Sequence, residues 1–189
     1  MIVLRYALFL GPMLIALLMS SPEGAANGSG SRKPPQKVTV GWLERVYLPE
    51  YDLRLRAKLD TGARNSSIHA SDLEYVSVAG KPPQSRVRFK VEDKEGGTRT
   101  LEADVIRTVT IKKPSLAASG PVTEPRIEIE LDVCLAGLTK RIRVNLTDRS
   151  GMNYRMLLGR SALEGTYLVD VSKKFTADSL CRRIKTKQK

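Results

Sequence analysis

One short segment of the sequence joins a carboxylate to the residues of a tight turn. Asp60, Thr61, Gly62 and Ala63 directly follow a stretch of alternating apolar residues, 53–59. Gly62 allows the backbone to turn closely, and the Thr61 hydroxyl is able to lock the loop through hydrogen bonds. An aspartate held in this way at the end of a strand is suited to exchange protons with a substrate. By itself, Asp-Thr-Gly is a common turn sequence.

A second element lies late in the sequence. Residues 156–160 read Met-Leu-Leu-Gly-Arg, so two bulky apolar residues precede a glycine, and a short helix is predicted directly afterwards. This pattern resembles the hydrophobic-hydrophobic-Gly element that packs beneath the catalytic loop of retropepsin-like aspartic peptidases. We therefore expect Leu157, Leu158 and Gly159 to support the loop around Asp60.

The resemblance extends to one bacterial family. Over roughly residues 38–175, the chain is similar to retropepsin-like proteins often labelled ATP-dependent zinc proteases and linked by name to RimB. The matching segments are Gly41-Trp42, Lys58-Leu-Asp-Thr-Gly-Ala-Arg64, Ser67, His69-Ala70, Leu146-Thr-Asp-Arg149 and Met156-Leu-Leu-Gly-Arg-Ser-Ala-Leu163. The resemblance implies that Asp60 is the catalytic residue and that residues 61–64 support its loop.

The number of catalytic aspartates predicts the assembly. An aspartic peptidase needs two carboxylates that share one proton, because two closely held carboxylates cannot both ionise. The chain has a single Asp-Thr-Gly. We therefore predict a symmetric homodimer in which Asp60 of each subunit faces the other across the twofold axis. A water activated between the two carboxylates would hydrolyse a peptide bond, and both copies of Thr61 would brace the paired loops.

A hairpin is expected to close over the cleft as a flap. The first candidate lies within residues 110–126, around Ser119 and Gly120. The second candidate is the hairpin at Gly96 and Gly97.

Two interpretations of Arg64 stay open. Its guanidinium, if it lies near the two aspartates, would favour their ionised forms and lower their pKa values. Alternatively, Arg64 is a surface residue that pairs with a carboxylate elsewhere, because exposed ion pairs are common and weak.

The zinc and ATP of the family label find no support in the residues. Zinc needs three or four His, Cys or carboxylate ligands at defined spacings. The chain offers His69, Cys134 and Cys181, far apart in the sequence, and it contains no Gly-x-x-x-x-Gly-Lys-[Ser/Thr] phosphate loop. We predict no metal, no ATP and no other cofactor, and we expect His69 to be a hydrogen-bonded structural residue.

The folded part is predicted to be all-β. Four stretches alternate apolar and polar residues with the period of two that a half-buried strand shows. Their apolar positions are Leu53, Leu55, Ala57 and Leu59; Val87, Phe89 and Val91; Ile127, Ile129, Leu131 and Val133; and Ile142, Val144 and Leu146. Many short strands separated by turns predict a small closed barrel of the retropepsin-like type. One short helix is expected after Gly159, with Ser161 as its N-cap.

The two ends of the chain differ from this body. Residues 1–26 combine Arg5, an apolar run and small residues, which is the pattern of a secretory signal; an uncleaved N-terminal anchor is the alternative. Residues 27–36 form a linker, 37–172 form the retropepsin-like domain, and 173–189 form a basic tail. The signal predicts a periplasmic or secreted protein.

An oxidising compartment of this kind would allow Cys134 and Cys181 to pair. The sequence leaves that pairing open, because Cys181 lies in the predicted tail.

The net charge of the chain indicates which kind of partner it would attract. The 189 residues include 32 Lys and Arg against 20 Asp and Glu, so the formal net charge is +12. This charge favours an acidic peptide or protein as substrate. Nucleic acid is not expected as a partner, because aromatic residues make up 5% and no recognition motif is present. The competing hypothesis is a non-catalytic barrel that holds an acidic peptide or an anionic cell-envelope polymer.

Overall fold

The computed structural model describes residues 36–93, 95–113, 122–177 and 181. Strands predominate in these residues, and the one α-helix among them is short. The strands are β1 (Val38–Leu48), β2 (Leu53–Leu59), β3 (Ser66–His69), β4 (Ser71–Tyr75), β5 (Arg86–Glu92), β6 (Thr98–Lys113), β7 (Val122–Leu135), β8 (Leu138–Thr147), β9 (Met156–Leu158) and β10 (Tyr167–Lys174). A 3₁₀ turn, η1 (Pro49–Tyr51), joins β1 to β2, and helix α1 (Arg160–Leu163) follows β9. The predicted all-β class is confirmed.

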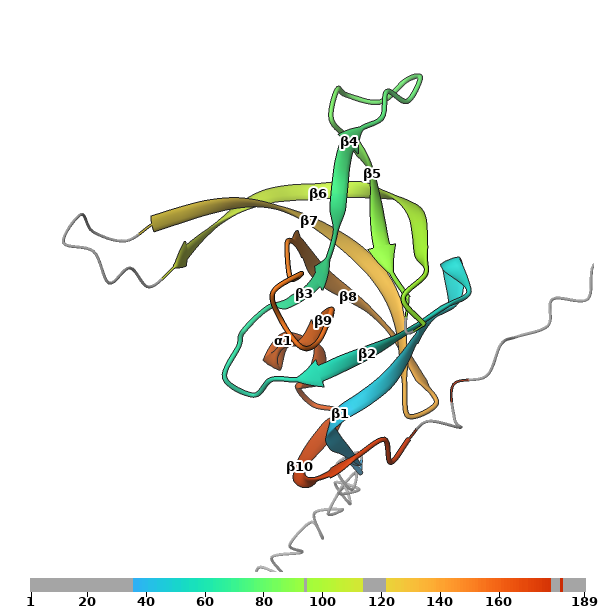
Figure 1. Ribbon diagram of the computed structural model, residues 1–189, viewed down its shortest axis with the longest axis vertical. Coiled ribbons are helices and arrows are strands. Elements are labelled where there is room, and N and C mark those ends of the chain that lie inside the picture. The colour runs from blue at the N-terminus through green and yellow to red at the C-terminus, as the bar shows by residue number, and fades with distance from the viewer. Residues whose placement is uncertain (1–35, 94, 114–121, 178–180, 182–189) are drawn as a thin grey trace, which may run out of the picture. The chain divides into compact units, whose positions relative to one another are not determined.

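The strands form one continuous sheet that curls into a ring. Its order is β10-β1-β2-β9-β3-β8-β7-β6-β5-β4. An additional pairing of β1 with β7, at Tyr47 and Cys134, closes β1, β2, β9, β3, β8 and β7 on themselves. Figure 1 shows β4, β5 and the far part of the β6–β7 hairpin projecting from this ring. The predicted small barrel therefore corresponds to the ring, to which the projecting strands are added.

The alternation of apolar and polar residues along the sequence corresponds to an alternation of buried and exposed side chains. The apolar residues of β2 are at most 4% exposed, whereas Arg54 and Lys58 between them are half-buried and Arg56 is exposed. Burial of each large apolar side chain contributes about 1.5–3 kcal/mol. A register slip of one residue would move every such side chain into solvent, so this burial also determines how the strands pair. Other buried members of the same core are Val87, Phe89, Val91, Ile129, Leu131, Val133, Ile142, Val144 and Leu146.

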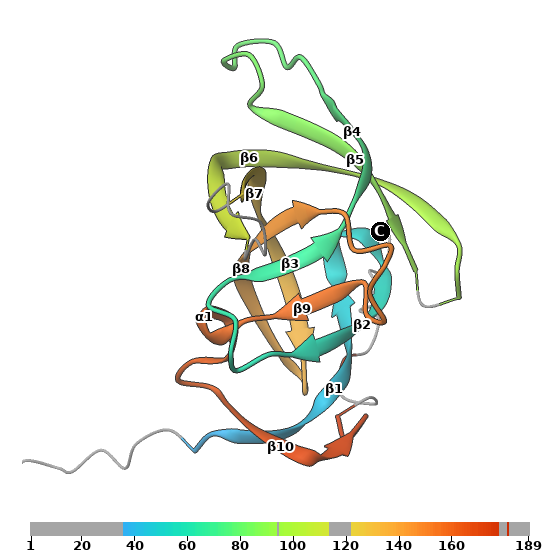
Figure 2. The same ribbon diagram turned by 60° about the vertical axis from the view of Figure 1, so that its left-hand side comes forward.

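Three short strands bring distant segments together beneath the Asp60 loop. β9 pairs in parallel with β2 and antiparallel with β3, so it lies between them, and β3 in turn pairs in parallel with β8. Figure 2 shows β2, β9 and β3 side by side. This strand order places β2, which precedes Asp60, and β3, which follows it, on either side of β9, the late Met-Leu-Leu segment.

Two features depart from the sequence-based prediction. The predicted N-cap was wrong: helix α1 begins at Arg160 after Gly159, no side chain caps it, and Ser161 is its second residue. β1 shows no clear alternation because residues on both of its faces are buried and its register with β10 shifts between Gly41 and Leu43. Its Glu44 is completely buried and accepts a hydrogen bond from Thr176 at 2.6 Å.

The two cysteines whose pairing the sequence left open form a disulfide, Cys134–Cys181. This bond ties the segment after β10 to β7, and β10 itself extends to Lys174. The predicted signal 1–26, the linker up to residue 35 and the tail from residue 182 lie outside the described residues. In the part of the chain that the structure describes, no helix has the length and apolar character to span a membrane.

Candidate active site

Asp60 lies where β2 ends and the loop 60–64 begins. Its backbone N–H donates to the carbonyl of Leu158 in β9 at 2.8 Å, which continues the pairing of the two strands. Leu158 is 2% exposed and packs in the core. The catalytic candidate is thus attached to the rigid part of the sheet.

The loop fixes one oxygen of the Asp60 carboxylate. Oδ1 accepts hydrogen bonds from the backbone N–H groups of Gly62 at 3.0 Å and Ala63 at 3.1 Å. Oδ2 lies 3.3 Å from the ammonium group of Lys58. The loop therefore holds the carboxylate in one orientation, with its second oxygen turned toward a cation.

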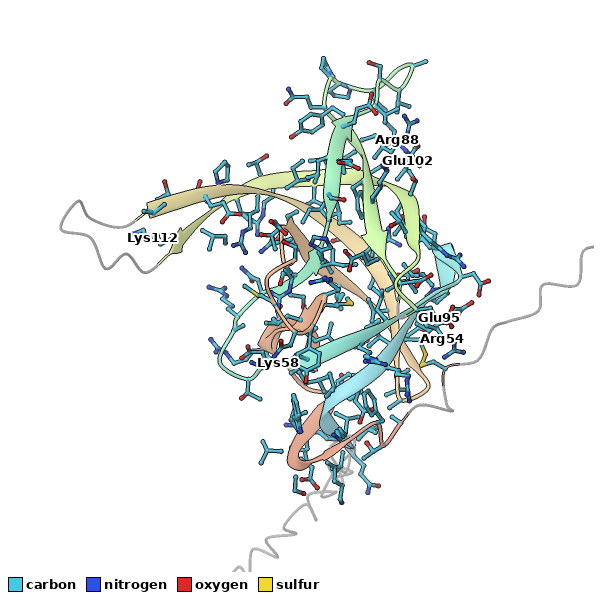
Figure 3. The ribbon with its side chains drawn as sticks, viewed as in Figure 1. Arg54, Lys58, Arg88, Glu95, Glu102 and Lys112 are labelled. Atoms are coloured by element: carbon cyan, nitrogen blue, oxygen red, sulfur yellow. A yellow bond between two sulfur atoms is a disulfide. The ribbon has the colours of Figure 1, made fainter. Side chains whose placement is uncertain are left out.

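Lys58 is a residue of the site that the sequence reasoning did not single out. The signal was present, because residues two apart on a strand share a face and Lys58 precedes Asp60 by two positions. Figure 3 shows Lys58 near the end of β2, where that strand leads into the loop.

These contacts change the acidity of Asp60. Burial on its own raises the pKa of the carboxyl group. Hydrogen bonds from Ala63, Lys58 and Gly62 outweigh that effect, and the pKa of Asp60 lies below its ordinary value. Hydrogen bonds to the charged form of a carboxyl favour that form. In a single chain, Asp60 is therefore held as a carboxylate.

Helix α1 holds the other side of the loop. The N–H groups of Arg160 and Ser161 donate to the carbonyls of Ala63 and Arg64 at 2.9 and 3.1 Å. The Arg160 side chain also donates Nη1 to the carbonyls of Thr61 and Gly62, at 3.0 and 2.7 Å. Arg160 thus braces the loop from outside.

Gly159 allows this close packing. A Cβ at position 159 would lie 2.6 Å from the carbonyl oxygen of Asn65 and 2.7 Å from that of Arg64. Both atoms belong to the backbone, so they could not move aside without shifting the loop. Leu157, Leu158 and Gly159 all lie in the segment that contacts the loop or its strand.

The remaining predicted site residues are located as follows. Thr61, Gly62 and Arg64 are exposed, and within the described residues no side chain pairs with that of Arg64. The cation that contacts Asp60 is Lys58 instead.

The two flap candidates differ in how much of each is described. β6 and β7 pair as far as Lys113 and Val122, so the strands lead directly to the first candidate, but Ser119 and Gly120 lie outside the described residues. The second candidate is the turn of the β5–β6 hairpin, where Gly97 donates to Asp93 at 2.9 Å. The identity of the flap stays a prediction.

A cross-strand row of residues extends from the site over the face of the sheet that is opposite the core. Residues paired directly across strands share a face. Successive pairings link Lys58 to Leu157, Leu157 to Ser67, Ser67 to Asn145, and Asn145 to Glu128. We call this face the polar face. It connects Asp60 to polar groups of β3, β8 and β7.

The loop 148–155 folds back over this polar face. Arg149 is 8% exposed, and its side chain donates to the Ser67 hydroxyl and the Tyr154 carbonyl, each at 3.1 Å. Burial lowers the pKa of Arg149 below its ordinary value; the neighbouring Arg126 lowers it further, and attraction to Asp60 opposes both. The guanidinium is therefore near enough to Asp60 for their charges to interact.

His69 belongs to the same loop contacts. It is 5% exposed, and its Nδ1 accepts a hydrogen bond from the backbone N–H of Arg149 at 2.9 Å. Within the described ranges, no three His, Cys, Asp or Glu side chains gather in a way that could hold a metal ion. Cys134 and Cys181 are bonded to each other.

The ring of strands, the Asp-Thr-Gly loop at the end of β2 and the Leu-Leu-Gly strand beneath it are together typical of retropepsin-like aspartic peptidases. Residues 39–179 match the RimB-like family, described as retropepsin-like aspartic endopeptidase RimB. The chain belongs to this family.

Curated relatives carry a different name. The chain is 33% identical over 140 residues to a probable α-L-glutamate ligase of Shewanella pealeana and 34% identical over 140 residues to one of Shewanella halifaxensis. These matches cover 74% of the chain and 30% of each relative, so the chain spans less than a third of their length.

A solved structure shows the same fold. A Legionella pneumophila protein of unknown function is 30% identical, with a TM-score of 0.60, and the match covers 75% of this chain and 99% of that one.

Proposed function

We propose that the chain is an aspartic endopeptidase in which Asp60 of each subunit of a homodimer activates the water that hydrolyses a peptide bond. The observation that carries this proposal is Asp60 at the end of β2, with one oxygen fixed by two backbone N–H groups, in a chain of the retropepsin-like family. In such a pair, one carboxylate acts as base while the other keeps the shared proton.

The surface beside the loop supports a second copy as the partner. A cavity of about 460 Å³ is lined by Thr61, Arg160, Leu163 and Tyr167, among others. Leu168 and Val171 of β10 are 53% and 80% exposed, and β10 is the last strand at its end of the described sheet. An exposed apolar end strand is a surface that another strand tends to cover. A copy bound there would bring its own loop toward this one.

An acidic peptide is the proposed substrate class. The net charge of +12 would attract it. Relatives that contain a matching region are named probable α-L-glutamate ligases, and this name supports an acidic peptide as the substrate class that we propose. We do not propose ligase activity for this chain, because the match covers only 30% of each ligase.

We also propose a periplasmic or secreted location. The pattern of residues 1–26 supports it, as does the Cys134–Cys181 disulfide, because disulfides persist mainly in oxidising compartments.

Digestion of a peptide library by the full chain tests the proposed activity. Asp60→Asn is nearly isosteric but removes the ionised base, so we expect cleavage to fall by at least about 10³-fold while the fold persists. Asp72→Asn is the matched control: Asp72 lies on β4, pairs with Lys90, and has a positive φ that Asn also tolerates. Cleavage that continues in folded Asp60→Asn protein would contradict the mechanism.

Two further measurements separate the remaining alternatives. Specific activity should fall on dilution, because each chain supplies one catalytic aspartate. Wild-type protein that binds acidic peptides and never cleaves them, at any pH from 3 to 8, would favour the non-catalytic barrel instead.

A further inference from the structure

The ring of strands closes at a narrow joint between β1 and β7. Within the described residues, these two strands share one registered pair, Tyr47 with Cys134, which we call the seam. The next joint of the ring is much longer, because β1 and β2 pair at every residue from Leu43 to Leu48. Cross-strand pairs are what stabilise a sheet, so the seam depends on other contacts to stay closed.

The Cys134–Cys181 disulfide lies directly at the seam. Cys134 is the β7 residue of the pair, and its bond to Cys181 spans 47 positions of the sequence. Tyr47 and the two cysteines form a small buried cluster that is separate from the main core. The sulfur of Cys181 also accepts a hydrogen bond from the backbone N–H of Gly137, in the turn after β7, at 3.4 Å.

Arg54 of β2 joins the same cluster from the other side of the seam. Its Nη2 donates to the carbonyl of Cys181 at 2.7 Å, and its guanidinium carbon lies 5.1 Å from the centre of the Tyr47 ring. Figure 3 shows the Arg54 side chain next to the disulfide. Cys181 therefore links β7 to β1 and β2, the two strands that face it across the seam.

The residues directly after β10 are held by a buried carboxylate. Glu44 of β1 is completely buried, and it accepts hydrogen bonds from the backbone N–H groups of Thr176 and Ala177 at 2.9 and 3.3 Å. It also accepts one from the Thr176 hydroxyl at 2.6 Å. Breaking these bonds would leave a charge without partners in the interior, so they hold Thr176 and Ala177 on β1. Both residues lie close to Cys181 in the sequence.

These contacts shield the disulfide from reductants. Cys134 is 6% exposed and Cys181 is 3% exposed. Reduction begins when a thiolate attacks one of the two sulfur atoms, so it requires access to the bond. Displacement of residues 176, 177 and 181 from β1 would provide this access, and the hydrogen bonds of Glu44 oppose that displacement.

We propose that the Cys134–Cys181 disulfide is a redox-sensitive lock of the seam, and that Glu44 controls how readily a reductant opens it. A small dithiol that reduces the bond becomes a cyclic disulfide, and Cys134 and Cys181 each take up one electron and one proton to become thiols. Residue 181 is then free to leave the seam, whereas Glu44 still holds Thr176 and Ala177. The lock is closed in an oxidising compartment and open in a reducing one.

Amide hydrogen exchange of the full-length protein tests the lock, with the oxidised protein compared to protein treated with dithiothreitol. We expect the amides of 45–48 and 132–136, on the two sides of the seam, to exchange at least about tenfold faster after reduction. The amides of 60–64 should not change, because backbone groups and helix α1 hold that loop separately. Equal exchange at the seam in the two states would overturn the proposal.

A variant without cysteines separates the lock from other effects of the reductant. The chain contains two cysteines, so a protein with both Cys134→Ser and Cys181→Ser has none. Its seam should exchange as fast as that of the reduced wild type, and dithiothreitol should have no further effect. A seam that stays as protected as in the oxidised wild type would overturn the proposal.

The rate of reduction tests the role of Glu44. Glu44→Gln keeps the shape of the side chain and removes its charge. At a fixed dithiothreitol concentration under native conditions, we expect thiols to appear at least about tenfold faster in this variant, as measured with a thiol-reactive dye. Thr176→Val removes one donor to Glu44 and should accelerate reduction about threefold.

Glu130→Gln is the matched control. It also removes a carboxylate, but the partners of Glu130 are the exposed side chains of Arg141 and Arg143, so we expect less than about a twofold change in rate. Equal rates in Glu44→Gln, Thr176→Val and the control would overturn the role of Glu44. If Glu44→Gln does not fold, Thr176→Val decides. None of these measurements needs peptide cleavage, so the proposal stands or falls independently of the proposed function.

Discussion

Two loops border the polar face, and they are held in different ways. The loop 60–64 is held by backbone groups close to it: N–H groups within the loop bind Asp60, and helix α1 binds the loop carbonyls. The loop 148–155 is held by long side chains. Arg149 reaches Ser67, and Arg155 joins Glu92 to several carbonyls of the loop. The first loop thus depends on local chain geometry, and the second depends on contacts between distant residues.

Of these two kinds of support, only the first leaves a recognisable motif in the sequence. Backbone-held geometry requires small residues at defined positions, so it leaves a motif such as Asp-Thr-Gly or Leu-Leu-Gly. Side-chain contacts between β3, β5 and the loop after β8 leave no local pattern, because their members are far apart in the sequence.

The largest effect is expected from closing the space at Gly159. In Gly159→Ala, the new Cβ would meet backbone oxygens of Arg64 and Asn65 at 2.7 and 2.6 Å, so the loop 60–64 or the helix must shift. We expect a loss of about 3 kcal/mol in the free energy of unfolding, measured by urea denaturation. Gly151→Ala in the other loop is the control, since a Cβ there meets nothing within 4 Å. Similar losses in both variants would contradict the comparison.

An intermediate effect is expected from removing the side-chain support of the second loop. Arg155 donates Nη1 to the carbonyls of Arg149, Ser150 and Met152, at 2.8, 2.7 and 3.2 Å. Arg155→Gln removes these bonds and the ion pair with Glu92. We expect a loss of about 2 kcal/mol, because charged hydrogen bonds contribute more than neutral ones.

Amide hydrogen exchange tests whether the Arg155→Gln substitution loosens only the second loop. In Arg155→Gln, the amides of 148–155 should lose protection while those of 60–64 keep theirs. Equal loss in both loops would mean that they are held as one unit. Arg141→Gln, which removes an exposed pair with Glu130, should cost less than about 1 kcal/mol.

The smallest effect concerns the charge of Asp60. The pKa of this carboxyl is depressed, so its ionisation stabilises the fold above the unfolded-state pKa, and that contribution is lost as the pH falls through the folded-state pKa. Lys58→Met removes one of the contacts that lower it. We therefore expect the pKa of Asp60 to rise, as measured by NMR titration of its carboxyl carbon.

Lys90→Met serves as the control for this titration, because Lys90 pairs with Asp72 away from the loop. The backbone N–H groups of Gly62 and Ala63 should keep part of the depression in Lys58→Met. A pKa of Asp60 that does not move would show that the loop backbone alone sets its acidity.

The strands and the first loop could be predicted because their signals are local. Alternation with a period of two identified β2, β5, β7 and β8, and burial on one face is what produces that alternation. β1 was not predicted, since residues on both of its faces are buried and an irregularity between Gly41 and Leu43 interrupts the period of two. Ser161 was assigned as the N-cap on residue type, but Gly159 is needed at the junction for close packing.

Three features can be read from the sequence: the all-β class, Asp60 on a loop at the end of a strand, and the Leu-Leu-Gly element beneath that loop. Each of these depends on a few neighbouring residues whose sizes and backbone freedom suffice to specify it. The folded chain was needed to show that Lys58 is the cation at Asp60, that Cys134 and Cys181 pair, and that Arg149 lies buried near the catalytic candidate. Those contacts depend on which strands become neighbours, and strand order is decided by the packing of the whole sheet, because no local stretch of sequence carries it.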